Sequence, residues 1–513
     1  MSKARRGQLM LGLVAAILAP RAYLAIADQG MVWADEIFQT LEQGHRLAFG
    51  YGLVPWEFKV GARSWLLPGA IGGVMKLLGV AGVGGGGLAM ALKLVFAALA
   101  VATFYPMLRM AYALGGAFAP LLLGLAACAF PASLIYSSRV LAEVASAPFL
   151  AFGLWLLLPW GMAGRACPVK IGRVAWIGGF AGGVGRLLVA GVLLGLCTVL
   201  RYQNAILLPA IVLMVAWRRG VKASAWLAAG MAVALALGGL LDWATWGRPF
   251  HSLLVYFRFN VVESGANQWG IAKRGFYLRV MLSSNGPIVL LLAAGFLAGL
   301  RRTWPVAVLA LLYLVTLSAI PHKELRFLFP VLPLFLLCAA VGLAGLLDRL
   351  PFPAGRRRAA AVGLGLAMGL LFAARARQVT FADIGQSMDS TEFGGPTSRL
   401  VWRAFDERNR LFEQAGRHAD LCGLAAPAMN PYWTGGYTYL HRRVPLLWSA
   451  SPPDLAAANY VIVSPGQRLD DPRYQVIAAA WAYTLQRRDG DCGPPPRGSA
   501  GFGRLTPFGV PGT

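Results

Sequence analysis

Two neighbouring acids near the N-terminus have a chemistry that their position makes conspicuous. Asp35 and Glu36 stand side by side directly after an apolar run. An ionised carboxylate can accept a proton from a hydroxyl group, as a general base does. Neighbouring residues of a helix point about 100° apart, so we expect only one of the two to face a given site.

A basic cluster is the second stretch with chemical potential. Residues 321–327 lie between two apolar runs and hold His322, Lys323 and Arg326 around the acid Glu324. His322 and Arg326 are four residues apart and would share a face of a helix. Grouped cations of this kind suit a phosphate or pyrophosphate at a membrane surface. The alternative is that the side chains only reach toward lipid headgroups, although on the outer side this would oppose the charge rule for membrane topology.

Further polar residues fall at the ends of other apolar runs. Arg139 and Glu143 are four residues apart, and they could either form an ion pair on one helix or face a substrate. Arg201 opens a polar break between two runs. The loop 242–284 mixes aromatic residues with amides, which suits the apolar faces and hydroxyl edges of sugar rings; ordinary loop packing is the alternative. Its candidates for substrate contact are Trp246, Asn260 and Trp269.

The composition places all these residues in a membrane protein. Of 513 residues, 57% are hydrophobic and 13% are charged, against roughly 45–50% and about 25% in soluble chains. So few charges could not cover a soluble surface, and a disordered chain needs low hydrophobicity. The 47 Lys and Arg outnumber the 22 Asp and Glu and give a net charge of +25. Because most basic residues lie at the ends of apolar runs, we attribute the excess to membrane topology and not to nucleic-acid binding.

Apolar runs of about 20 residues predict about eleven membrane-spanning helices. They are expected near 8–27, 88–109, 116–135, 140–160, 174–199, 203–217, 223–241, 285–300, 303–320, 326–347 and 359–374. The first is interpreted as a signal anchor, because no convincing cleavage site follows it. The stretch 66–83 is broken by Pro68 and glycines and is interpreted as an interfacial or re-entrant segment, with a twelfth span as the alternative.

The basic loops assign the sides of the membrane. Basic groups stand in every second loop, beginning at Lys3, Arg165, Arg218, Arg301 and Arg356. Loops rich in Lys and Arg stay in the cytoplasm, so the two acids, the basic cluster and the C-terminal region are expected on the outer side.

Residues 376–513 differ in character from the rest. Their apolar runs shorten and charges return, so we expect a small extracytoplasmic α/β domain there, after a membrane domain of residues 1–375. An amphipathic helix is predicted over 396–416 and strands at 420–425, 444–448 and 460–464. Outside the cytoplasm, Cys422 and Cys492 could form a disulfide. None of the six cysteines has metal-site spacing.

These motifs together resemble a known family. Asp35-Glu36-Ile37-Phe38-Gln39, with Trp56-Glu57-Phe58 and Arg63-Ser64, is similar to the first outer loop of glycosyltransferase family 22, the lipid-phosphomannose-dependent mannosyltransferases of N-glycan and GPI-anchor assembly. His322-Lys323-Glu324-Leu325-Arg326-Phe327 resembles its second hallmark. Its central loop is matched from Asp242 to Val261, and Arg201-Tyr202-Gln203 matches a further position. Trp33-Ala34 stands where the family often has His-Pro, and Trp246 stands where it usually has Tyr.

The resemblance implies a GT-C membrane fold and an inverting transfer of mannose from a polyprenyl-phosphate donor to a lipid-linked glycan or polysaccharide. It implies Asp35 as the general base, with Glu36 second. The implied donor-phosphate ligands are His322, Lys323, Arg326 and Arg201, and the implied pocket residues are Trp56, Glu57 and Arg63. The Ala-, Gly- and Arg-rich composition indicates a bacterial relative, with the site on the periplasmic side of the inner membrane.

No cofactor is implied beyond the lipid-linked donor, and a divalent metal is not required, although Asp35 and Glu36 could hold one. Two alternatives stay open. A related transferase could use another polyprenyl-linked sugar, or act on lipid A or protein. A secondary transporter would need polar groups at the membrane midplane and inverted repeats; the polar groups of this sequence lie at one interface, and no repeat is evident.

Overall fold

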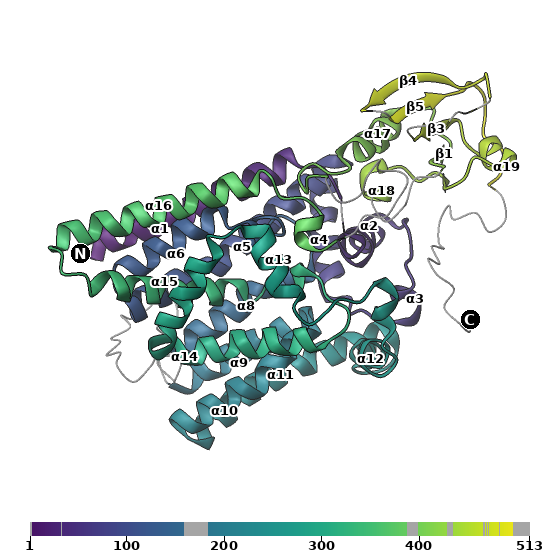
Figure 1. Ribbon diagram of the computed structural model, residues 1–513. Coiled ribbons are helices and arrows are strands. Elements are labelled where there is room, and N and C mark those ends of the chain that lie inside the picture. The colour runs from purple at the N-terminus through teal and green to yellow at the C-terminus, as the bar shows by residue number, and fades with distance from the viewer. Residues whose placement is uncertain are drawn as a thin grey trace.

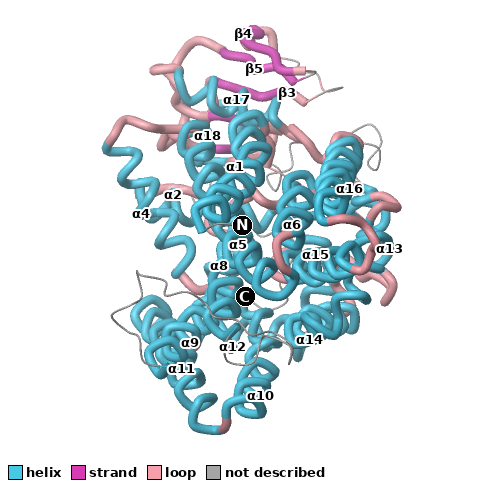
Figure 2. Tube along the Cα trace, turned by 90° about the vertical axis from the view of Figure 1, so that its left-hand side faces the viewer, coloured by secondary structure: helices cyan, strands magenta, loops and turns pink. Residues whose placement is uncertain are grey.

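The computed structural model describes residues 3–31, 33–158, 183–386, 399–427, 434–464, 467, 469, 471–481 and 483–495. Most helices lie side by side in one bundle, and a small sheet stands at one end of it (Figure 1). Figure 2 shows that the strands are confined to this end, next to α17 and α18. The predicted basic loop that begins at Arg165 lies outside the described residues.

Long apolar helices form the bundle. Within the described residues, six helices are long and apolar enough to cross a membrane. They are α1 (Lys3–Ala27), α5 (Gly86–Gly115), α9 (Gly183–Leu200), α11 (Val221–Trp246), α14 (Val289–Ala319) and α16 (Ala354–Ala376). Four shorter apolar helices pack among them: α4 (Leu66–Val80), α6 (Phe118–Ala129), α8 (Ala142–Leu157) and α15 (Leu332–Asp348). The chain is therefore a multi-pass membrane protein, while the count of eleven spans stays a prediction.

The other helical elements of the bundle are shorter. The α-helices among them are α2 (Glu42–Phe49), α3 (Glu57–Val60), α7 (Pro131–Leu134), α10 (Leu208–Arg219), α12 (His251–Phe257) and α13 (Phe276–Asn285). Two π-helical segments are η1 (Asp35–Leu41) and η5 (Arg258–Val262). The 3₁₀ turns are η4 (Tyr202–Leu207), η6 (Gly265–Trp269), η7 (Leu325–Leu328) and η8 (Ala382–Ile384).

One predicted loop is wrong. The sequence predicts two spans separated by Arg301 and Arg302, but both arginines lie inside the continuous helix α14, which also contains Pro305. Neither arginine carries a turn signal, and a proline within a helix bends it without having to end it. Glycines then bring α14 close to α15, because a side chain at Gly342 would overlap the backbone of Gly295. Small residues allow this close approach between membrane helices.

Basic residues gather at the helix ends that point away from the two acids. The guanidinium of Arg6, early in α1, lies 4.5 Å from the ring centre of Tyr112, near the end of α5. Arg218, in the last turn of α10, lies 5.4 Å from the ring centre of Trp304. The opposite ends of α1 and α10 lead to Asp35 and Arg201. The positions of Arg6 and Arg218 agree with two of the predicted basic ends, while the alternation of loops and the side of the membrane that each end faces stay predictions.

The C-terminal region contains a five-stranded sheet among its described residues, in the order β2-β1-β3-β5-β4. Its strands are β1 (Leu424–Ala425), β2 (Leu446–Leu447), β3 (Tyr460–Val463), β4 (Gln475–Ala480) and β5 (Tyr483–Arg487). β1 pairs in parallel with β2 and β3, and β5 pairs antiparallel with β3 and β4. The three strands predicted from the sequence are therefore confirmed, and β4 and β5 were not predicted.

Helices α17 (Asp406–Arg417), α18 (Gly436–Leu440) and α19 (Pro452–Ala456) accompany the sheet. The predicted amphipathic helix begins ten residues later than expected, because Leu400 forms an extended bridge with Thr380 and Phe405 has a left-handed backbone. Cys422 and Cys492 form a disulfide with Cα atoms 5.9 Å apart. The division between domains at residue 375 stays a prediction.

Candidate active site

An ion pair between Asp35 and Arg326 lies at the centre of the polar residues. Arg326 donates from Nη1 to Oδ2 of Asp35 at 2.6 Å. Asp35 begins the π-helix η1, and π-helical turns occur frequently at functional sites. Its side chain keeps 24% of its surface exposed, whereas that of Arg326 keeps 6%. The carboxylate of Asp35 is therefore held in place and still accessible.

Glu324 fixes the other edge of the Arg326 guanidinium. Nε and Nη2 of Arg326 donate to the two carboxylate oxygens of Glu324 at 2.8 and 2.6 Å. His322 reaches the same carboxylate through Nε2 at 3.3 Å. Glu324 has an extended backbone and the 3₁₀ turn η7 begins only at Leu325, so no helix runs from His322 to Arg326 and the shared helical face predicted for them is wrong. Lys323 points elsewhere and donates to the carbonyl oxygen of Ala272 at 2.7 Å.

Glu143 links Arg326 to a second buried arginine. Its Oε1 lies 3.1 Å from Nη2 of Arg201 and 3.6 Å from Nη1 of Arg326. All three side chains are almost fully buried. Of the two roles left open for Arg139 and Glu143, the ion pair within one helix is therefore not formed, and each side chain pairs with residues far away in the sequence. The result is an alternating set of charges around Asp35.

A pocket lies beside this set of charges, between η1, α4 and the end of α9. Its lining is part apolar and part polar, and comprises Gln39, Thr40, Arg63, Ser64, Leu66, Leu67, Pro68, Ala142, Val199, Leu200, Arg201, Tyr202 and Tyr256. Arg63 and Arg201 contribute positive charge, and Nε of Arg63 is buried without a hydrogen-bond partner. Such a pocket can take a ligand that has an anionic end and an apolar body.

Aromatic rings continue from the basic cluster. The ring of Trp56 lies 4.6 Å from that of Phe259 and 6.0 Å from that of Trp269, between ring centres. Trp269 lies 6.5 Å from His322. Rings arranged in this way can pack against a sugar. The structure therefore brings Trp56 and Trp269 next to the basic cluster.

The other predicted pocket residues have local partners. Trp246 donates from Nε1 to the carbonyl oxygen of Arg63 at 3.2 Å. Glu57 is buried and accepts from Nε2 of Gln39 at 3.1 Å. Asn260 donates from Nδ2 to the carbonyl oxygen of Tyr256, one turn earlier, at 2.9 Å. All three residues thus bond residues that line the pocket, and the bond of Asn260 to Tyr256 is local in sequence.

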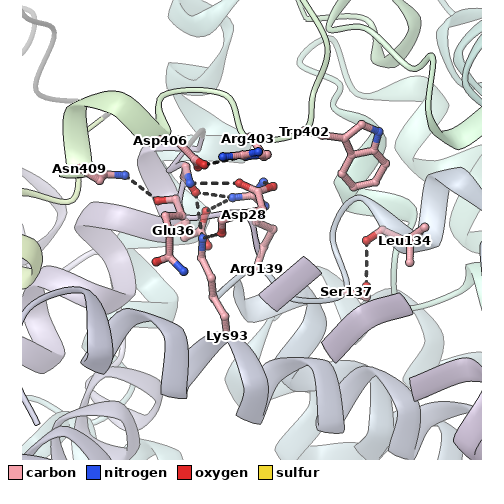
Figure 3. A network of polar contacts seen from close by, with 12 residues as sticks. Asp28, Glu36, Lys93, Leu134, Ser137, Arg139, Trp402, Arg403, Asp406 and Asn409 are labelled. Carbon is pink, nitrogen blue, oxygen red and sulfur yellow. Dashed lines mark hydrogen bonds and ion pairs between the residues drawn. The ribbon is translucent and has the colours of Figure 1, made fainter. Parts of the chain in front are cut away.

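Glu36 and Arg139 lie in a different cluster from Asp35. Arg139 pairs with Asp28 at 2.6 Å and faces Glu36 at 3.8 Å. Glu36 is fully buried and accepts from the backbone N–H of Val140 at 3.0 Å. Figure 3 shows Asp28, Glu36, Lys93 and Arg139 around one point, with Asp406 of α17 beside them. The two adjacent acids therefore point to separate sites and do not converge on one ligand.

The surroundings of the central acids set their protonation. Burial works to raise the pKa of Asp35, but attraction by Arg326 and Arg63 outweighs it, so its pKa lies below the usual range. Burial also opposes ionisation of Glu324, yet Arg326 and His322 hold its pKa well below normal. For Glu36, burial prevails over the attraction of Arg139, and its pKa is raised. At neutral pH, Asp35 and Glu324 are therefore both ionised, and Asp35 is the more exposed of the two.

Sequence reasoning missed part of this site. The sequence marks Glu324 as a single acid among three cations, which is the signal for a carboxylate that bridges His322 and Arg326. Gln386 donates from Nε2 to Oε2 of Glu324 at 3.2 Å. No sequence signal points to Gln386, which follows 62 residues later. Within the described residues, no three His, Cys, Asp or Glu side chains come together as a metal site would require.

Comparison with solved structures identifies the fold. The chain is similar to ArnT from Cupriavidus metallidurans bound to undecaprenyl phosphate, with a TM-score of 0.59, 14% identity, and coverage of 96% of this chain and 100% of that one. The apo state of ArnT gives a TM-score of 0.57 at 16% identity, over 94% of this chain and 98% of that one. These likenesses confirm the GT-C membrane fold.

Comparison with characterised sequences points to one enzyme class. GPI mannosyltransferase 3 of Yarrowia lipolytica is 29% identical over 335 residues, which is 63% of this chain and 60% of that protein. The chain thus matches somewhat less than two thirds of this relative. Mannosyltransferase APTG1 of Arabidopsis thaliana is 44% identical over 66 residues, 13% of this chain and 12% of that one. The model of the Alg9-like mannosyltransferase family matches residues 13–393. Since this match covers most of the chain, including Asp35 and Arg326, the protein belongs to the Alg9-like mannosyltransferase family.

Proposed function

We propose that this protein transfers a sugar, in the first place mannose, from a polyprenyl-phosphate donor to a hydroxyl group of a lipid-linked glycan or polysaccharide. The observation that carries the proposal is the ion pair of 2.6 Å between the accessible Asp35 and Arg326, next to a pocket with Arg63 and Arg201. A proton acceptor and several cations thus stand close together. This is what a glycosyl transfer with a phosphate leaving group needs.

The transfer proceeds as one displacement. The acceptor hydroxyl oxygen attacks C1 of the sugar, and its proton passes to Asp35. The bond from C1 to the phosphate oxygen breaks, and the polyprenyl phosphate leaves with the electron pair. Attack from the opposite face converts a β-linked donor into an α-glycoside. The developing negative charge on the phosphate is stabilised by Arg326 and Arg201, with His322 close by.

Donor binding changes the basicity of Asp35. In the structure, Arg326 shares its guanidinium between Asp35, Glu324 and Glu143. A phosphate that draws Nη1 of Arg326 away removes the attraction that depresses the pKa of Asp35, so the carboxylate becomes a stronger base only when donor is present. The acceptor would then be deprotonated only at a loaded site. Lys323, which bonds backbone carbonyls, is a less direct ligand of the phosphate.

The lipid tail has a route beside the charges. The pocket has an apolar wall beside its arginines, with Leu66, Leu67 and Pro68 on α4 and Leu200 on α9, and such a wall suits the first part of a polyprenyl chain. ArnT, which shares the fold, was solved with undecaprenyl phosphate bound. We place the site on the periplasmic face of the inner membrane, as the distribution of basic loops favours.

A transfer assay tests the proposal. Purified protein in detergent receives radiolabelled polyprenyl-phosphate mannose and membrane-extracted acceptor lipids. The wild type is expected to transfer label and Asp35→Asn to lose at least about 100-fold of the rate. Asp420→Asn is the matched control, because Asp420 pairs with Arg487 in the C-terminal region. Transfer by Asp35→Asn at the wild-type rate would reject Asp35 as the base. No transfer with mannose or with a panel of other polyprenyl-linked sugars would reject the function.

A further inference from the structure

The C-terminal region contacts the segment that carries Asp35 on both sides of η1. Before η1, the carbonyl oxygen of Gln29 accepts from Nδ2 of Asn409 at 2.8 Å and from the hydroxyl of Tyr439 at 2.9 Å. After η1, Oε1 of Glu42 accepts from the backbone N–H and the hydroxyl of Thr438 at 2.9 and 3.0 Å. The catalytic helix is therefore bounded by two sets of bonds from one distant part of the chain.

The two sets of bonds belong to a single unit. Asn409 lies on α17, whereas Thr438 and Tyr439 lie on α18. Oδ1 of Asn409 accepts from the backbone N–H of Gly435 at 2.7 Å, which ties α17 to the beginning of α18. We call this pair of helices, α17 and α18, the clamp. The two helices of the clamp cannot move independently without breaking the bond between Asn409 and Gly435.

Both contacts of the clamp region with the chain around η1 would cost free energy to break. Glu42 is fully buried, and the backbone N–H of Leu53 also donates to it at 3.2 Å. A buried carboxylate that loses its donors pays the full cost of lost hydration. Before η1, Gly30 lies so close to the backbone oxygen of Ala404, just ahead of α17, that a side chain at Gly30 would overlap it. Figure 3 shows the same junction, where Asp406 and Asn409 of α17 approach Asp28.

The catalytic helix needs such support from outside. A π-helix is rare and appears mostly as a single turn, because its geometry is less favourable than that of an α-helix. η1 must hold Asp35 toward Arg326 while the next residue, Glu36, points into the other cluster. A small rotation of η1 would separate the carboxylate of Asp35 from the acceptor that it serves.

We propose that the clamp positions Asp35 for catalysis, and that Asn409, Thr438 and Tyr439 are positioning residues that act through η1. This proposal rests on the function proposed above, because it takes Asp35 as the base. It assigns to the C-terminal region a role in the transfer step, in place of a role in binding the acceptor.

The test removes two side-chain hydroxyls without changing shape. The double variant Thr438→Val/Tyr439→Phe deletes one donor to Glu42 and one to Gln29. The matched control is Tyr474→Phe, whose hydroxyl donates to the carbonyl oxygen of Ala458 at 2.6 Å within the C-terminal region. Thr438→Ser keeps the hydroxyl donor and serves as the conservative variant.

Two readouts are combined for each variant. Hydrogen–deuterium exchange of peptides within residues 33–45 is expected to speed up in the double variant and to stay unchanged in Tyr474→Phe and Thr438→Ser. The value of kcat is expected to fall about tenfold in the double variant. This is less than the roughly 100-fold loss that a misplacement of about 1 Å can cause. The donor KM is expected to change less than about twofold, since a uniform loss of binding would act on KM instead.

Each outcome decides the question. Unchanged exchange shows that the clamp does not restrain η1, and unchanged kcat with faster exchange shows that the restraint does not serve catalysis; either overturns the proposal. A rise in KM with constant kcat assigns the region to substrate binding and overturns it as well. If wild type transfers no sugar, the proposed function fails, while the exchange experiment still reports on the clamp. If the double variant does not fold, Thr438→Val alone carries the same outcomes.

Discussion

Arg326 and Asp35 are 291 residues apart in the chain and meet in an ion pair of 2.6 Å. The pair joins the loop after the first span to the turn between α14 and α15. It also joins the two chemical roles, since one partner can accept a proton and the other can stabilise a phosphate. Without donor, each charge neutralises the other. The two roles are therefore coupled through a single contact that a bound phosphate would rearrange.

The first prediction concerns the shape of this cation. Arg326→Lys keeps the positive charge but supplies one ammonium in place of a planar fork, so it cannot bond Glu324 on one edge and Asp35 on the other. We expect kcat/KM for the donor to fall about 100-fold, as when one preorganised donor to a developing charge is removed. Initial rates of label transfer measure the effect.

Arg473→Lys is the control for this substitution. Arg473 forms a comparable two-pronged pair with Asp471, but 67% of its side chain is exposed in the C-terminal region. It should keep the wild-type rate. Full activity in Arg326→Lys would show that charge alone suffices and would remove the geometric argument.

The second prediction concerns the acidic limb of the rate profile. The pKa of Asp35 lies below its usual range, because Arg326 and Arg63 outweigh the effect of burial. The basic form is present above that pKa, and activity is lost as pH falls through it. In Arg63→Gln one attraction disappears, so the pKa of Asp35 rises and the acidic limb moves to higher pH, by at most the 1–3 units or so typical of such pairs. The measurement is kcat/KM, which reports the groups of the free enzyme, from about pH 3 to about pH 8. A limb at the same pH in both proteins would disprove the assignment.

The third prediction concerns the alkaline side. Burial lowers the pKa of His322, but its bond to Glu324 and the charge of that carboxylate outweigh burial and raise the pKa. The imidazolium therefore persists to higher pH than that of an unperturbed histidine, and it is lost as pH rises through the raised pKa. We expect the donor KM to increase on the alkaline side, because a cation next to the phosphate is lost. In His322→Gln this dependence on pH should vanish. A KM that varies equally with pH in both proteins would exclude His322 from donor binding.

The fourth prediction separates the two adjacent acids. Glu36 contacts Arg139 and the N–H of Val140 in a buried cluster. Glu36→Gln removes the negative charge that faces Arg139, and we expect the free energy of unfolding to fall by about 1–3 kcal/mol. Well below its melting temperature the variant should keep most of kcat, whereas Asp35→Asn should melt like wild type and lose kcat. Thermal unfolding followed by tryptophan fluorescence, with rates measured in parallel, distinguishes the two. Equal loss of kcat in both variants would return Glu36 to the reaction.

The sequence predicted the chemistry of this site better than its geometry. Two acids after the first span and a basic cluster before α15 can be found from residue types alone, because charges are costly at membrane depth. The residue types alone do not tell which acid faces Arg326, because η1 adopts a π-helical backbone that no residue pattern marks, and the preference for Asp35 rests on the family resemblance. The spacing of Arg139 and Glu143 left an ion pair or a shared substrate contact open, and the long-range partners that separate them could not be predicted from it. The contacts of Glu42 with Thr438 join residues 396 positions apart, and local patterns carry no record of such contacts.

The fifth prediction tests on which side of the membrane the site lies. Cys422 and Cys492 form a disulfide, and disulfides persist outside the reducing cytoplasm. Asn409 of α17 and Thr438 of α18 belong to the same region as the disulfide, and they contact the chain on either side of η1. The disulfide and Asp35 therefore lie on the same side of the membrane. In spheroplasts of an expressing bacterium, whose inner membrane is still sealed, a membrane-impermeant maleimide should label the chain only after mild reduction. Labelling should disappear in Cys422→Ser/Cys492→Ser, while the remaining described cysteines, of which Cys197 and Cys338 are buried, stay unreactive. Labelling only after the cells are lysed would place the catalytic face in the cytoplasm and would require a donor on that side, whereas labelling before lysis without reduction would show that Cys422 and Cys492 lie outside as free thiols.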